Sequence, residues 1–248
     1  MTLATPIDTT TTTTGESPAR RAWSRLLARK TAVVGLVLVI TLITLAIFAD
    51  VIAPYDPNKQ SWTLLRNPPS AAHWFGTDES GRDLLSRVIF GARASLLAGV
   101  VSVLIAILIG VPLGLVAGYR GGWIDTIISR ITDAMLAIPF LILAIAMAAF
   151  LGPSLRNAMI AVGLASTPVF VRLTRGQVMA VKTEDYVEAA RAVGNPGWRV
   201  AARHILPNIL PALLVQATVA IAAAIIAEAS LSFLGLGQQL PRRRGAPC

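Results

Sequence analysis

Residues 183–211 read TEDYVEAARAVGNPGWRVAARHILPNILP, a charged and polar stretch between strongly apolar segments. Thr183 is a suitable N-cap, and the two acids after it favour the positive end of a helix dipole. Gly194 is a suitable C-terminal cap, and the Asn-Pro-Gly turn leads into a shorter helix from Trp198 to Pro207. Apolar residues recur at i, i+3, i+4 and i+7 and predict one helix face: Tyr186, Ala189, Ala190 and Val193.

The rest of the chain is dominated by apolar residues. Of its 248 residues, 54% are hydrophobic and 14% are charged. Apolar runs long enough to cross the bilayer core recur along it, so the composition indicates an all-α polytopic membrane protein in contact with lipid. The net charge of +9 is explained by Lys and Arg in cytoplasmic segments, so nucleic-acid binding is not expected.

Five membrane spans are expected. Basic residues precede the first span, which predicts a cytoplasmic N-terminus. Pro139 should kink the third span, and glycines spaced four residues apart in the second span should allow close helix packing. These glycines are Gly110, Gly114 and Gly118. The spans cover about 31–48, 95–117, 134–150, 155–171 and 209–233.

Enzyme signatures are missing from the sequence. It has no phosphate-binding G-x-x-x-x-G-K-[ST] motif, and its two histidines, His73 and His204, fall on opposite predicted sides of the membrane. We therefore expect no catalytic residue, cofactor or metal. Glu228 is an acid in the outer part of the fifth span, and it is either a pathway or gate residue or a hydrated interfacial residue. Arg130 and Asp133 are expected to pair along one helix.

The 183–211 stretch resembles the EAA loop of permeases from binding-protein-dependent ABC importers. The pattern E-A-A, three residues, G, nine residues, I-x-L-P is matched by Glu188-Ala189-Ala190, Gly194 and Leu206-Pro207, with His204 at the Ile position. Residues 73–87 and 227–237 are similar to two further segments of the dipeptide, oligopeptide and nickel permeases of the C-subunit type. Three motifs in the expected order make this resemblance specific.

The resemblance implies a type I importer transmembrane domain in a bacterial inner membrane. It implies a heterodimer with a second, homologous permease, two ATP-binding subunits and an extracytoplasmic solute-binding protein. The chain would form half of the pathway for peptides or a related solute such as nickel. The loop would dock on an ATPase through Tyr186, Glu188, Ala189, Ala190, Arg191, Gly194, Leu206 and Pro207.

The composition, the expected spans and the resemblance divide the chain into five segments. They are a disordered cytoplasmic N-terminus (1–19), a basic segment with the first span (20–52), an external loop with an interfacial segment (53–94), the permease core with its loop (95–237) and an atypical tail (238–248). The family's sixth helix is not recognisable, and the basic tail would lie outside, as in a frameshifted reading frame. A truncated, transport-inactive remnant and a secondary transporter are the alternatives.

Overall fold

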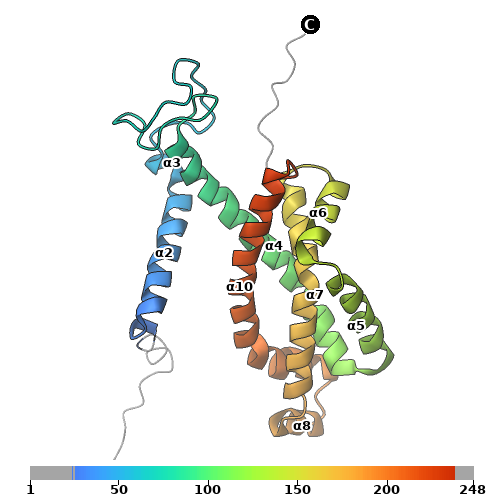
Figure 1. Ribbon diagram of the computed structural model, residues 1–248. Helices are drawn as coiled ribbons and strands as arrows, with labels where there is room; N and C mark the ends of the chain where they lie inside the picture. Colours follow the sequence, from blue (N-terminus) through green and yellow to red (C-terminus); the bar gives the residue numbers. More distant parts are fainter. Residues whose placement is uncertain (1–23, 25, 238–248) are drawn as a thin grey trace, which may run out of the picture.

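The computed structural model describes residue 24 and residues 26–237 (Figure 1). Within these residues the secondary structure is helical, apart from one isolated bridge between Thr77 and Asp83. The helices are α2 (Lys30–Ile47), α3 (Ala49–Ile52), α4 (Leu84–Arg120), α5 (Gly122–Leu136), α6 (Phe140–Leu151), α7 (Leu155–Val181), α8 (Asp185–Ala192), α9 (Gly197–Val200), a π-helical turn (Ala201–Ile205) and α10 (Leu206–Phe233).

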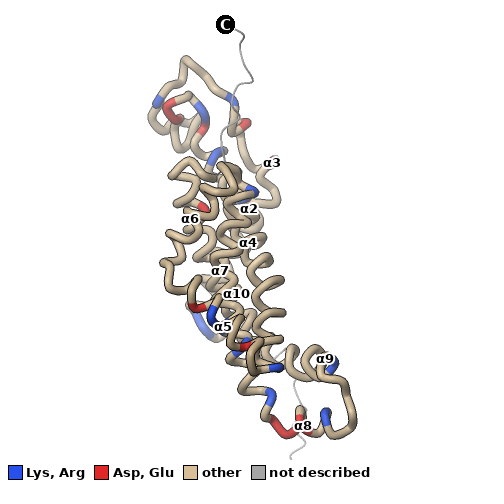
Figure 2. The backbone as a smooth tube through the Cα atoms, turned by 90° about the vertical axis from the view of Figure 1, so that its right-hand side faces the viewer, with Lys and Arg blue, Asp and Glu red and all other residues tan. Residues whose placement is uncertain are grey.

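Four described helices are long and apolar enough to cross a membrane: α2, α4, α7 and the segment ending in α10. A fifth span results if the bent pair α5 and α6 is one segment. Figure 2 shows charged residues around the 53–83 loop at one end, around α8 and α9 at the other, and beside α5 between them. This arrangement confirms the predicted all-α polytopic membrane fold.

The close packing of α4 against α7 forms the centre of the bundle. A methyl group at Gly110 would lie 2.7 Å from Phe170 Cβ, one at Gly114 would lie 2.6 Å from Thr174 Cβ, and one at Gly118 would lie 2.8 Å from Val178 Cβ. The two backbones can therefore approach only because these positions lack a side chain. The predicted packing role of the glycines is confirmed. Helix α10 packs on both helices of this pair, and α6 packs on α7.

Two helices are longer than the sequence patterns predicted. The expected interfacial segment and the second span form the single helix α4, because Asp83 caps it and nothing after Leu84 interrupts it. The fourth span was expected to end near residue 171, but α7 continues to Val181. Its buried residues Thr174 and Val178 keep packing on α4, so tertiary contacts extend the helix beyond its apolar core.

The third span is broken rather than kinked. Between α5 and α6 the chain bends by 92°, and Pro139 is the N-cap of α6. Proline cannot donate a backbone hydrogen bond and disfavours helix at the preceding residue, which explains the break. The predicted Arg130–Asp133 pair is wrong, because Asp133 accepts a hydrogen bond from Arg172 of α7.

The start of α2 and the end of α10 lie at opposite ends of the molecule, as expected for an odd number of membrane spans. In Figure 1, the start of α2 and helix α8 lie at one end of the molecule, and the 53–83 loop and the end of α10 lie at the other. The predicted disordered segment 1–19 and the atypical tail 238–248 fall outside the described residues.

Substituting Gly114 should test the α4–α7 contact. Gly114→Ala would bring the new methyl group within 2.6 Å of the Val171 carbonyl oxygen, so we expect a destabilisation of about 1–3 kcal/mol. Gly176→Ala is the control, since nothing lies within 4 Å of that position. Thermal unfolding of the purified protein in detergent measures both, and equal unfolding temperatures would contradict the packing role of Gly114.

Candidate functional site

Helix α8 begins without a side-chain cap. Glu184 is the N-cap residue, and no side chain bonds to the first free backbone N–H groups. Thr183, the predicted cap, instead donates a hydrogen bond to the Ala180 carbonyl oxygen at the end of α7. Of the two acids predicted for the first turn, Asp185 lies there, whereas Glu184 is the N-cap residue. Glu188 is the second acid of that turn, where negative charge favours the helix dipole.

The end of α8 follows the sequence prediction. Gly194 has a φ of +86°, a left-handed conformation that residues with a Cβ rarely adopt. Its N–H donates to the Arg191 carbonyl oxygen over 2.9 Å, and the Asn195 side chain donates to the Ala190 carbonyl oxygen over 3.0 Å. These bonds satisfy carbonyl groups that the helix end would otherwise leave unpaired, so the sharp turn is built into the loop.

Helix α8 has a buried face and a free apolar face. Val187 and Ala190 are buried, so Ala190 does not share the exposed face on which the sequence placed it. Tyr186, Ala189 and Val193 remain exposed, and Val193 has 84% of its surface accessible. The loop thus exposes apolar side chains at the end of the molecule that holds α8 and α9.

The charged residues of α8 differ in their surroundings. In the described part of the chain, no hydrogen bond or ion pair reaches the exposed Glu188 carboxylate. Arg191 lies over the ring of Tyr119 at the end of α4, with 5.1 Å between its Cζ atom and the ring centroid. Glu188 is thus free to bind a partner, whereas Arg191 already has a contact within the chain.

The predicted second helix from Trp198 to Pro207 does not exist as a separate element. Helix α9, the π-helical turn and α10 follow one another without a break, and Pro207 lies in the first turn of α10. A proline there needs no N–H partner and does not end the helix. Leu206 is half-buried and Pro207 is exposed, so both predicted loop residues mark the start of the last span.

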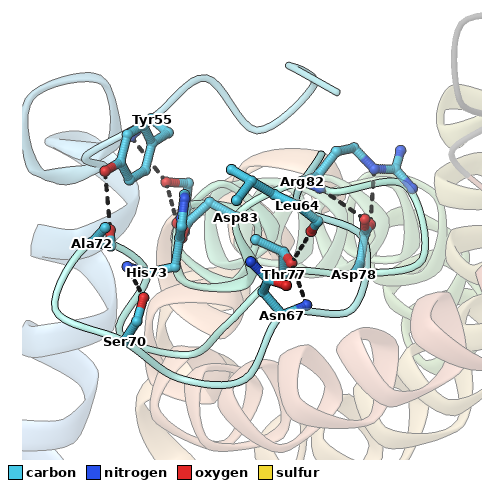
Figure 3. A network of polar contacts seen from close by, with 11 residues as sticks. Tyr55, Leu64, Asn67, Ser70, Ala72, His73, Thr77, Asp78, Arg82 and Asp83 are labelled. Atoms are coloured by element: carbon cyan, nitrogen blue, oxygen red, sulfur yellow. Dashed lines mark hydrogen bonds and ion pairs between the residues drawn. The ribbon is translucent and has the colours of Figure 1, made fainter. Parts of the chain in front are cut away.

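At the opposite end, the sequence motif at residues 73–87 forms a polar network that caps α4 (Figure 3). Asp83 accepts hydrogen bonds from the Ser86 N–H over 2.8 Å and the Ser86 hydroxyl over 2.7 Å, and His73 Nδ1 lies 3.0 Å from its other oxygen. Tyr55 stacks on the His73 ring with 4.7 Å between centroids. One buried carboxylate therefore joins the loop to the start of α4.

A second acid holds the loop that precedes α4. Asp78 accepts hydrogen bonds from the N–H groups of Arg82 and Ser80 and pairs with the guanidinium groups of Arg82 and Arg87. Burial tends to raise the pKa of Asp78, but these donors outweigh burial and hold it below the usual value. Gly81, with a φ of +69°, packs against the backbone of residue 61, which only glycine permits.

Glu228 lies on the packed face of α10. It is 7% exposed and falls among the buried residues Ala224, Ala227 and Leu231. No described residue bonds to its carboxylate or forms an ion pair with it. Both interpretations of Glu228, as a pathway or gate residue and as a hydrated interfacial residue, stay predictions.

A cavity of about 250 Å³ lies on another face of α10, between that helix, α7 and the α5–α6 bend. Pro139, Phe140, Phe170 and Val219 are among its largely apolar lining, and Gln216 is one of its few polar residues. Glu228 does not line it. Sequence reasoning missed this cavity, although Gln216, an amide within the apolar part of α10, was a signal for it.

No group of three or more His, Cys, Asp or Glu residues that could hold a metal occurs among the described residues. His73 is part of the network around Asp83, and His204 lies in the π-helical turn at the other end of the molecule. The arrangement contains membrane spans, an exposed loop helix and an apolar cavity. These features define a polytopic membrane protein that exposes a helical loop at one end.

Family comparison assigns the chain to a specific class of transporter. Residues 110–245 match the family of binding-protein-dependent transport system inner membrane components, and residues 17–69 match the N-terminal transmembrane domain of oligopeptide transport permease C. The chain belongs to this permease family of ABC importers. It is therefore an integral inner-membrane protein that works with ATPase and solute-binding subunits, and it is not itself an enzyme.

Similar proteins occur in several bacteria. A dipeptide transport system permease of Alkalihalophilus pseudofirmus is 46% identical over 228 residues, covering 92% of this chain and 75% of the relative. A probable D,D-dipeptide transport system permease of Escherichia coli is 48% identical over 205 residues, covering 83% and 69%. A glutathione transport system permease of Pectobacterium atrosepticum is 44% identical over 226 residues, covering 91% and 75%.

The fold is similar to that of a solved importer. A chain of the inward-facing methionine ABC transporter MetNI superposes with a TM-score of 0.55 at 23% identity, covering 61% of this chain and 76% of that chain. A second crystal form gives a TM-score of 0.52 at 24% identity, covering 58% and 73%. At this level of identity the likeness concerns the fold, and it supports the type I importer architecture.

Removing the Asp83 carboxylate should loosen the start of α4. Asp83→Ala deletes the cap on Ser86 and the contact with His73, so we expect a loss of about 0.5–2 kcal/mol of local stability. Faster amide hydrogen exchange at residues 84–87 measures this loss. Glu79→Ala is the control, because the Arg66–Glu79 pair is largely exposed and such pairs stabilise little. Equal exchange in the two variants would refute the capping role.

Proposed function

We propose that this permease imports peptides or a related small solute. The support is its similarity to relatives named for dipeptide and glutathione transport. We further propose that it pairs with a second, homologous permease, so that each chain forms half of the pathway. Its N-terminus would be cytoplasmic, because α2 starts at the same end as α8, which must meet an ATPase inside the cell.

The proposed site of coupling is helix α8 with its flanking turns. The carrying observation is the exposed apolar face of Tyr186, Ala189 and Val193, opposite the buried Val187. A partner that covers this face would remove apolar area from water, and the unpaired Glu188 supplies a charge for an oriented contact at its edge. Docking of an ATPase here would let ATP-driven closure move the loop and change the access of the pathway.

The remaining predicted contact residues have different roles in this proposal. Ala190 supports the helix from its buried side, and Gly194 sets the turn that keeps α8 flat against a partner. Leu206 and Pro207 begin α10 and carry the movement of the loop into the last span. Arg191 holds the helix to α4 through its contact with the Tyr119 ring.

Glu188→Ala should uncouple transport from ATP hydrolysis. It removes one partner of a charged contact without disturbing a bond inside the chain, so we expect uptake of radiolabelled dialanine per ATP hydrolysed to fall about tenfold or more. The measurement uses the complete importer in proteoliposomes. Unchanged uptake in a complex that still holds its ATPases would remove Glu188 from the docking contact.

Substitutions at Gly194 separate the turn from the docking surface. Gly194→Asn keeps the left-handed backbone at small cost, whereas Gly194→Val strains it. No atom of the chain lies within 4 Å of a Cβ at this position, so the bundle has room for either side chain. We expect Gly194→Val to impair ATPase association more than Gly194→Asn. The same association in both variants would show that the turn geometry is dispensable.

We propose that the cavity face of α10, rather than Glu228, contributes to the pathway. Gln216 is a polar side chain on that face, whereas Glu228 packs among small apolar residues. The buried carboxylate would then be an internal residue of the bundle.

Neutralising Glu228 is expected to leave the bundle at least as stable. Glu228→Gln preserves side-chain volume and removes a charge that has no described partner, which lowers the cost of burial. Thermal unfolding and uptake by the reconstituted importer are the measurements, with Gln216→Leu as the comparison. A selective loss of uptake in Glu228→Gln, with unfolding unchanged, would restore Glu228 as a gate residue.

A further inference from the structure

The inner end of α4 is fixed to the end of α7. A methyl group at Gly118 would lie 2.8 Å from Val178 Cβ, so the two helices touch through their backbones. The Lys182 ammonium group donates a hydrogen bond of 3.0 Å to the Gly118 carbonyl oxygen. The last turn of α4 therefore has a defined position just before the loop helices begin.

Tyr119, the next residue, contacts the loop helices at two points. The Arg191 guanidinium group of α8 lies over its ring at 5.1 Å from the centroid. The α9 backbone also reaches the ring, because a methyl group at Gly197 would lie 3.0 Å from Tyr119 Cε1 and 3.2 Å from its hydroxyl oxygen. One half-buried aromatic side chain thus touches both α8 and α9.

These contacts join segments that are far apart in the sequence. The loop is covalently continuous with α7 on one side and α10 on the other, and α8 packs chiefly on α9 and the π-helical turn. Helix α4 is not adjacent to the loop in the sequence, yet it runs from the Asp83 network to the inner end of the bundle (Figure 1). Its 37 residues span about 55 Å at 1.5 Å per residue.

We propose that Tyr119 is a positioning residue that ties the α8–α9 loop to α4, so that the loop and the inner end of α4 move as one unit. The inference rests on the proposed docking of α8 on an ATPase. Through this contact, a displacement of the docked loop acts on α4 directly as well as through α7 and α10. Helix α4 then carries it toward the outer loop that Asp83 anchors.

The chemistry of the contact makes specific demands on its residues. A cation is attracted by the face of an aromatic ring, and a phenyl ring serves almost as well as a phenol. Tyr119→Phe should therefore behave like the unmodified protein, and Tyr119→Leu should not. Gly197→Leu should act like Tyr119→Leu, because a side chain there must displace the ring.

The first experiment measures coupling in the complete importer reconstituted in proteoliposomes. We expect Tyr119→Leu to lower dialanine uptake per ATP hydrolysed by about two- to fivefold, the range expected for losing one cation–π contact. ATPase subunits should still co-purify, because the docking face of α8 is untouched. Arg191→Gln combined with Tyr119→Leu should add little to either single substitution if the two residues act as a pair.

The second experiment follows the movement itself. With Cys248 replaced by Ser, spin labels at Arg120→Cys and at Ala192→Cys, an exposed α8 position outside the docking face, report the distance between the end of α4 and the loop. We expect one narrow distance that is the same without nucleotide and with ATP and vanadate. In Tyr119→Leu the distance should broaden or change with nucleotide, and in Tyr119→Phe it should not.

The outcomes separate this inference from the docking proposal. If Tyr119→Leu matches Tyr119→Phe in both coupling and distance while Glu188→Ala uncouples transport, the Tyr119 inference is overturned and the docking site stands. If Tyr119→Leu uncouples and loosens the loop while Glu188→Ala does nothing, the inference is supported and the proposed docking role of Glu188 fails. Additive effects of Arg191→Gln and Tyr119→Leu would assign Arg191 to another partner.

Discussion

The absence of side chains along one stripe of α4 allows the bundle to form around the α4–α7 pair. Gly110, Gly114 and Gly118 let the α7 backbone approach so closely that any methyl group would overlap it. In a membrane, lipid is as apolar as the helices, so association depends on such contacts rather than on hydrophobic burial. The position of α10, the cavity beside it and the ends of both loops follow from this pair.

The same contact organises the two polar ends of the molecule. Because α4 is held against α7 from Ser102 to Gly118, its first turn can be anchored by Asp83 and its last turn can present Tyr119 to the loop helices. A rigid element that bears a specific contact at each end can transmit a displacement. A helix free to tilt within the bundle would absorb it instead.

Several features of the fold and the site were predictable from the sequence, for local reasons. The apolar runs predicted the spans because their length must match the bilayer. Gly194 predicted the sharp turn after α8 because its left-handed conformation is a property of one residue and its neighbours. The spacing of glycines predicted close packing, although it did not identify α7 as the partner helix.

The sequence by itself therefore determined an all-α membrane protein, its charged loop between the last two spans and its family resemblance. Only the tertiary structure decided which face of α8 is buried, because the periodicity of Tyr186, Ala189, Ala190 and Val193 cannot tell which side meets the bundle. It also extended α7, paired Asp133 with Arg172 and brought Arg191 over Tyr119. These contacts join residues distant in the chain, and their partners are fixed by helix packing rather than by local sequence.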